Sequence, residues 1–168
     1  MFSMEYLKLA EAFEKIESTR KRLEMTEILV ELFNEIKMLV SKLFDKAVYL
    51  TQGKLFEIRP EESENEHEYK KYFGAIEIGV AEKLALKAIY EATRIDEAKI
   101  ENWWIESGDL GYVAFQAVNM KKQTPLYTEK LSIQTVFINL LQLPIISGSG
   151  SQDKKMKILA NLFHDASP

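Results

Sequence analysis

Apolar residues recur every three or four positions along most of this chain, the spacing that places them on one face of an α-helix. The alternation of apolar and polar residues that is typical of a strand does not persist beyond four or five residues. The pattern therefore predicts an all-α protein, an irregular multi-helix bundle of about seven or eight helices. The apolar stripes run over residues 6–16, 23–36, 43–50, 80–89, 100–105, 110–117, 133–141 and 156–163.

Residues suited to helix ends separate these stripes. Ser18 and Thr19 interrupt the first two, and their hydroxyl oxygens can accept hydrogen bonds from the free N–H groups of the next helix. Asp96 can cap a later helix in the same way, and Gly108-Asp109 is expected to start another. Pro144 is expected to end the helix before it, because the residue preceding a proline is disfavoured in helical conformation.

Composition narrows the class of protein. A chain of 168 residues that is 46% hydrophobic and 29% charged can bury the core of one domain. The absence of cysteine excludes a disulfide framework and a thiol nucleophile, and it is consistent with a reducing cytoplasm. Two histidines, His67 and His164, are too few for a histidine-based zinc site. With no signal peptide and no apolar run long enough to span a bilayer, we expect a cytoplasmic protein without membrane contact.

The net charge of −4 averages over segments of opposite sign. Residues 57–72 carry six glutamates around Pro60 and few apolar anchors, which predicts a solvated acidic loop or insertion. Residues 119–130 are polar around Pro125 and are expected to form a connector. From residue 119 onward the chain has six lysines against three acids, so the whole-chain charge is a poor guide to local surface potential.

The chain contains no arrangement typical of a catalytic centre: no Lys-x-Asp-Gly, phosphate loop, paired histidines or Gly-x-Ser-x-Gly. The strongest local signal in the sequence is a segment that would suit a phosphate oxygen. The glycines of GSGSQDKK, Gly148 to Lys155, permit close backbone approach, and Ser151 is a natural N-cap. The helix start would offer N–H groups and a positive dipole end to a phosphate, beside Lys154 and Lys155. A flexible turn before an ordinary capped helix is the alternative.

A second group of polar residues lies between the first two stripes. Thr19, Lys21 and Arg22 could also hold a phosphate at a helix start. The alternative is a capped helix with solvated basic side chains. The pair Trp103-Trp104 could stack on a base, but the neighbouring isoleucines favour burial of at least one indole.

Five segments, in order along the chain, carry a family resemblance. They are LAEAFEKIESTRKRLEMTEILVELF (Leu9 to Phe33), VYLTQGKL (Val48 to Leu55), IGVAEKLALKAIYEAT (Ile78 to Thr93), SGDLGYVA (Ser107 to Ala114) and GSGSQDKKMKILANLFHDASP (Gly148 to Pro168). Together they span nearly the whole chain, which resembles the N-terminal region of archaeal-type ATP-dependent DNA ligases.

The resemblance implies that residues 1–168 form a single helical DNA-binding domain that grips nicked duplex DNA without reading its sequence. In this family the catalytic work is done, with ATP and Mg²⁺, by a following nucleotidyltransferase domain and an OB-fold domain, both absent here. We therefore expect no enzymatic activity and no cofactor in this chain alone. The full-length enzyme would join nicks in DNA replication, repair and recombination, and in an archaeon it would be nucleoid-associated.

The resemblance also assigns candidate residues. The DNA-contact candidates are Thr19, Lys21, Arg22, Gly79, Lys83, Gly148, Gly150, Ser151, Lys154 and Lys155. The family usually has a second glycine where this chain has Ala81, which weakens close backbone approach near Gly79 and Lys83. Some relatives bind a sliding clamp through a glutamine followed by apolar and aromatic residues, and Gln123, Leu126 and Tyr127 occupy that position. This segment has one aromatic residue where the motif has two, and it contains an unexpected Pro125, so an ordinary connector is the alternative.

Two function classes follow from the sequence. The first is a non-sequence-specific DNA-binding domain that holds a nicked duplex. The alternative is a helical protein-interaction module that recruits a sliding clamp or repair partner. Steep loss of duplex affinity with salt would favour the first, because only phosphate contacts release counterions.

A chain without Lys-x-Asp-Gly should not become adenylated, because it lacks the lysine that attacks ATP in the family. Incubation with labelled ATP and magnesium should leave the protein unlabelled. A stable lysyl-adenylate, detected as a mass increase on the intact chain, would contradict the expectation that these residues are non-catalytic.

Overall fold

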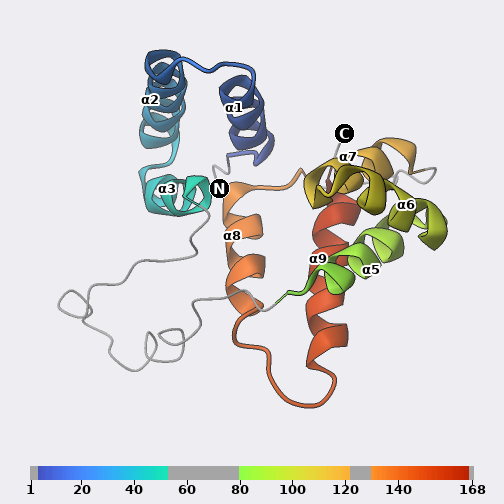
Figure 1. Cartoon of the computed structure of the whole chain (residues 1–168). Coiled ribbons are helices and arrows are strands. Elements are labelled where there is room, and N and C mark those ends of the chain that lie inside the picture. Colours follow the sequence, from blue (N-terminus) through green and yellow to red (C-terminus); the bar gives the residue numbers. More distant parts are fainter. Residues whose placement is uncertain (1–3, 53–79, 122–129, 167–168) are drawn as a thin grey trace. The chain divides into compact units, whose positions relative to one another are not determined.

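The computed structural model describes residues 4–52, 80–121 and 130–166. Within these ranges it contains eight α-helices and one short 3-10 helix (Figure 1). The only extended pairing there is an isolated antiparallel bridge between Glu5 and Ser132. The all-α class is therefore confirmed. The contacts divide the chain into two compact units, residues 1–65 with 130–140 and residues 66–129 with 141–168.

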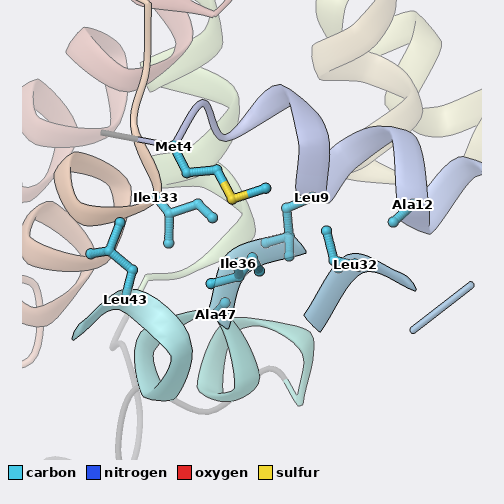
Figure 2. Close-up of a cluster of buried hydrophobic side chains, with 8 residues drawn as sticks. All are labelled: Met4, Leu9, Ala12, Leu32, Ile36, Leu43, Ala47 and Ile133. Carbon is cyan, nitrogen blue, oxygen red and sulfur yellow. The ribbon is translucent and has the colours of Figure 1, made fainter. Parts of the chain in front are cut away.

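The first unit contains α1 (Leu7–Glu17), α2 (Arg22–Leu39), η1 (Ser41–Leu43), α3 (Phe44–Thr51) and most of α8 (Ile133–Gln142). Its core consists of apolar side chains from all of these elements and from Met4, drawn in Figure 2. Leu9, Ile36 and Ile133 are fully buried within it. Residues far apart in the sequence are joined by two backbone hydrogen bonds, Tyr6 N to Leu131 O at 2.7 Å and Ile133 N to Met4 O at 3.0 Å.

The second unit contains α5 (Glu82–Thr93), α6 (Glu97–Ser107), α7 (Leu110–Met120) and α9 (Ser151–Asp165). Helix α5 packs against α6, α7 and α9. The core is formed by Ile89, Ile100, Val113 and Ala117. Both indoles of the Trp103-Trp104 pair pack against this core and are partly buried, as the neighbouring isoleucines led us to expect for at least one of them.

Several predicted helix ends are confirmed. The Asp96 carboxylate accepts a hydrogen bond from Lys99 N at 3.2 Å at the start of α6. At the start of α7, the Asp109 carboxylate accepts from Gly111 N at 2.7 Å and from Tyr112 N at 3.2 Å. Helix α8 ends two residues before Pro144. These carboxylates satisfy N–H groups that have no partner within their helices.

Two helix boundaries differ from the sequence prediction, and one predicted loop lies outside the residues that the structure describes. Helix α7 continues through Met120, so the connector expected from residue 119 begins two residues later. Ser18 and Thr19 precede α2 without occupying its N-cap position, where Lys21 stands instead. The acidic segment 57–72 is outside the described residues. No helix in the described ranges has the length and apolarity needed to cross a bilayer.

Arg94 ends α5 in the left-handed region, at φ +56°, where a Cβ atom is disfavoured. Its guanidinium binds the Glu91 carboxylate at 2.7 and 3.0 Å on the protein surface. The conformation satisfies a carbonyl of the last turn, because Arg94 N donates to Tyr90 O at 2.8 Å. A glycine would adopt this backbone without strain.

We expect Arg94→Gly to be about 1 kcal/mol more stable than Arg94→Ala, because both remove the ion pair but only glycine removes the Cβ. Urea unfolding followed by circular dichroism measures the difference. Equal midpoints for the two variants would mean that the left-handed backbone carries no strain here.

Candidate nucleic-acid interface

The turn before α9 is built by glycines in the left-handed region. Gly148 has φ +86° and Gly150 has φ +74°, values that residues with a Cβ rarely adopt. Gly150, not Ser151, occupies the N-cap position of α9, and no side chain caps this helix start. The prediction that Ser151 is the N-cap is therefore wrong: the glycine turn places Ser151 inside the first turn, where its N–H donates to Gly148 O at 3.2 Å.

The first turn of α9 keeps unpaired donors. The N–H groups of Gln152 and Asp153 have no acceptor among the described residues, as expected for a helix start without a side-chain cap. Lys154 N donates to Gly150 O at 3.2 Å, which begins the regular helix. Open N–H groups and the helix dipole together favour an anion at such a position, although the exposed Asp153 carboxylate opposes one.

The lysines of α9 differ in their exposure to solvent. Lys154 is exposed, whereas Lys155 is buried with only 7% of its surface accessible and has an interaction partner. This burial contradicts the sequence interpretation that treated both lysines as solvent-facing cations, because consecutive helix residues point in directions about 100° apart. Lys157, one turn after Lys154, is exposed and continues the same face. The pair Lys154 and Lys157 therefore carries the accessible charge of this helix start.

The start of α5 resembles that of α9 in lacking a side-chain cap. Ala81 occupies the N-cap position, and the exposed Lys83 follows in the first turn. Leu84 N and Ala85 N both donate to Ala81 O, at 2.9 and 3.1 Å. Gly79, the other candidate in this segment, lies outside the described residues, and so do Gln123, Leu126 and Tyr127.

In the first unit, the turn between α1 and α2 brings Thr19 and Lys21 together on a third residue, Glu24. The Thr19 hydroxyl donates to Glu24 Oε2 at 2.5 Å, and Lys21 Nζ donates to Glu24 Oε1 at 2.7 Å. Lys21 N also donates to Thr19 Oγ1 at 3.2 Å. Arg22 is exposed, and its side chain has no partner among the described residues. Two of the three predicted phosphate contacts in this turn are thus already occupied by a carboxylate.

These donors lower the pKa of the Glu24 carboxyl group. The ion pair with Lys21, followed by the hydrogen bond from Thr19, holds the pKa of Glu24 below its ordinary value of 4.5. The sequence pattern did not single out Glu24 as a candidate residue. The available signal was its place three residues after Lys21, at the third helical position, where a glutamate commonly reaches back toward the residues before the helix.

Lys121 is the second residue that sequence analysis missed. It stands just after α7, and its Nζ donates to His164 O at 2.9 Å and to Ala166 O at 2.6 Å. This ammonium therefore caps the C-terminal end of α9, where carbonyl groups lack helical partners and the dipole is negative. Burial lowers the pKa of Lys121, and the charge of Asp165 opposes that shift. No local sequence signal connects residues 43 and 45 positions apart.

The described residues hold no group of three or more histidine, aspartate or glutamate side chains that could bind a metal ion. Their chemistry is that of open helix starts and exposed cations. Open N–H groups at helix starts and exposed cations are features that favour anions such as phosphates.

Comparison with known proteins identifies the family. The chain belongs to the family described as DNA ligase N terminus, whose model matches residues 5–168. It is 42% identical over 165 residues to the DNA ligase of Nitrosopumilus maritimus, covering 98% of this chain and 25% of that protein. Over 165 residues it is 39% identical to the DNA ligase of Cenarchaeum symbiosum and 34% identical to DNA ligase 2 of Korarchaeum cryptofilum, with the same coverage in each case. The chain therefore spans about a quarter of the length of these relatives.

The lowered pKa of Glu24 makes a pH-dependent contribution to stability. Its carboxylate stabilises the folded chain above pH 4.5, and this contribution is lost as the pH falls through the lowered pKa. The stability difference between the wild type and Glu24→Gln should therefore be larger at about pH 6 than at about pH 3. Urea midpoints at both pH values measure it.

Glu27→Gln is the matched control, because Glu27 is an exposed carboxylate one turn further along α2 with no partner among the described residues. If both variants change stability with pH to the same extent, the contacts of Glu24 with Thr19 and Lys21 contribute nothing to the fold.

Proposed function

We propose that this chain binds duplex DNA through sequence-independent phosphate contacts and holds a nicked duplex for a DNA ligase. The observation that carries the proposal is the match of residues 5–168 to the DNA ligase N terminus family. The relatives named above are DNA ligases in which this region occupies about a quarter of the length. The remaining length of such an enzyme would supply the ATP- and Mg²⁺-dependent joining reaction, and this region would position the DNA.

The start of α9 is the phosphate contact that the geometry supports best. The glycine turn places no side chain between the helix start and a ligand, since a Cβ added at Gly148 or Gly150 would meet open space. The unpaired N–H groups of Gln152 and Asp153 can donate to phosphate oxygens. Lys154 and Lys157 add attraction that does not depend on base sequence.

The start of α5 and the α1–α2 turn are the further candidates. Lys83 is exposed in the first turn of a helix without a side-chain cap. Arg22 is exposed beside Thr19 and Lys21 at the start of α2. Contacts of this kind fix the position of a duplex but do not distinguish bases, which suits an enzyme that acts at nicks in any sequence.

Replacing Lys154 and Lys157 together by alanine should weaken binding to every duplex sequence alike. If each ammonium meets one phosphate, the slope of log affinity against log salt should fall by about 0.9 for each lysine removed. Fluorescence anisotropy on a labelled nicked duplex, at several salt concentrations and for two unrelated sequences, measures both effects.

Lys37→Ala with Lys42→Ala is the matched control, because both lysines are exposed and neither lies at a proposed contact. This pair makes the same change in net charge and should leave the salt slope unchanged. Equal slopes for the two double variants would remove the start of α9 from the DNA-binding surface. Absence of salt-dependent binding by the wild type would overturn the proposed function as a whole.

A further inference from the structure

In the α1–α2 turn, the carboxylate of Glu24 occupies the donors that the proposed function would use to bind a DNA phosphate. Glu24 Oε2 accepts from the Thr19 hydroxyl, and Glu24 Oε1 lies 2.7 Å from Lys21 Nζ. Lys21 N donates to Thr19 Oγ1 at 3.2 Å, so the three residues form one connected cluster. A carboxylate and a phosphate present the same kind of anionic oxygen to hydroxyl and ammonium donors. The donors that would meet DNA are therefore bound to a residue of the chain itself.

We infer that Glu24 regulates DNA binding at this turn, holding Thr19 and Lys21 as an internal substitute for a DNA phosphate until it is displaced. The inference rests on the proposed function, since it concerns the contact that the α1–α2 turn makes with duplex DNA. Glu24 lowers the affinity of this contact and keeps its donors ordered in the absence of DNA.

Displacement is feasible because the cluster is accessible. The side chains of Lys21 and Glu24 are 77% and 44% exposed. Exposed ion pairs of this kind change an equilibrium constant by less than about fivefold. A DNA phosphate that takes the place of Glu24 also releases condensed counterions, which the carboxylate does not. The exchange is therefore close to balance, and small changes at Glu24 should be visible in DNA affinity.

The residues around the cluster would bring DNA to it. Arg20 and Arg22 flank Lys21, both are exposed, and neither side chain has a partner among the described residues. They can meet the polyanion before Glu24 is displaced, as long-range attraction precedes close contact. The Glu24 carboxylate and a DNA phosphate then compete for the Lys21 ammonium, and the fraction of Lys21 bound to phosphate depends on the salt concentration.

The chain offers a matched pair of variants to test this. Glu24→Gln and Glu27→Gln each remove one negative charge from α2, but only Glu24 contacts Thr19 and Lys21. A glutamine at position 24 can still accept the hydrogen bond from Thr19. The long-range effect of charge on DNA binding should be similar for both variants, so any difference between them reports on the cluster.

We expect Glu24→Gln to bind a labelled nicked duplex about two- to fivefold more tightly than Glu27→Gln at low salt. Its salt slope should be steeper by up to about 0.9, because Lys21 becomes available to a phosphate. Both effects should disappear when each variant also carries Lys21→Met. Anisotropy titrations at several salt concentrations measure the affinities, and circular dichroism checks that all four proteins keep their helices.

The outcomes separate this inference from the function on which it rests. Salt-dependent binding with equal affinities for Glu24→Gln and Glu27→Gln would overturn the inference and leave the proposed function standing. Weaker binding by Glu24→Gln would also overturn it, because Glu24 would then support the contact instead of competing for it. Absence of DNA binding by the wild type and by every variant would overturn both.

Discussion

Every α-helix leaves N–H groups at its start and carbonyl groups at its end without partners inside the helix. In this chain, the groups outside each helix that bind these N–H and carbonyl groups determine whether that helix end can also bind an anion. The carboxylates of Asp96 and Asp109 accept hydrogen bonds from N–H groups at the starts of α6 and α7, and the Ser132 hydroxyl oxygen accepts one from Thr135 N at the start of α8. At the end of α9, the Lys121 ammonium donates to carbonyl oxygens. Helices α5 and α9 instead begin after Ala81 and Gly150 with no side-chain cap, and α1, α2 and α3 also lack one. The capping hydrogen bonds stabilise the helix ends where they occur. The starts of α5 and α9 keep N–H groups that can donate hydrogen bonds to an anion.

The fold was predictable because burial follows helical periodicity. The stripe that contains Leu9 and the stripe that contains Ile36 indicated helices, and these two residues are fully buried in the first core. The pattern could not predict that contacts would divide the chain into two units, because that division depends on which stripes face one another. It also could not place Ile133 in a core otherwise built from residues 4–47, because only tertiary contacts connect those segments.

The candidate site was only partly predictable, for two physical reasons. Residue type indicated which side chains could meet a phosphate, but it did not indicate which of them the fold already uses. Lys155 is buried and Lys21 is bound to Glu24, although both read as accessible cations in the sequence. Ser151 suited an N-cap by residue type, yet the left-handed conformation of Gly150 placed the helix start one residue earlier. Capping of α9 by Lys121 could not be predicted from the sequence, because this residue follows α7 and reaches the end of α9 only through tertiary structure.

These contacts also explain how a chain with a net charge of −4 can be proposed to bind a polyanion. Affinity for a duplex depends on the number of phosphates that cations meet, each of which contributes counterion release, and not on the total charge. Burial of Lys155 and pairing of Lys21 with Glu24 each remove one cation from that number. The exposed Lys83, Lys154 and Lys157 remain in the second unit. On the proposed function, the strength of DNA binding depends on how many cations the fold leaves without an internal partner, and the accessible carboxylate of Glu24 is one place where that number can change.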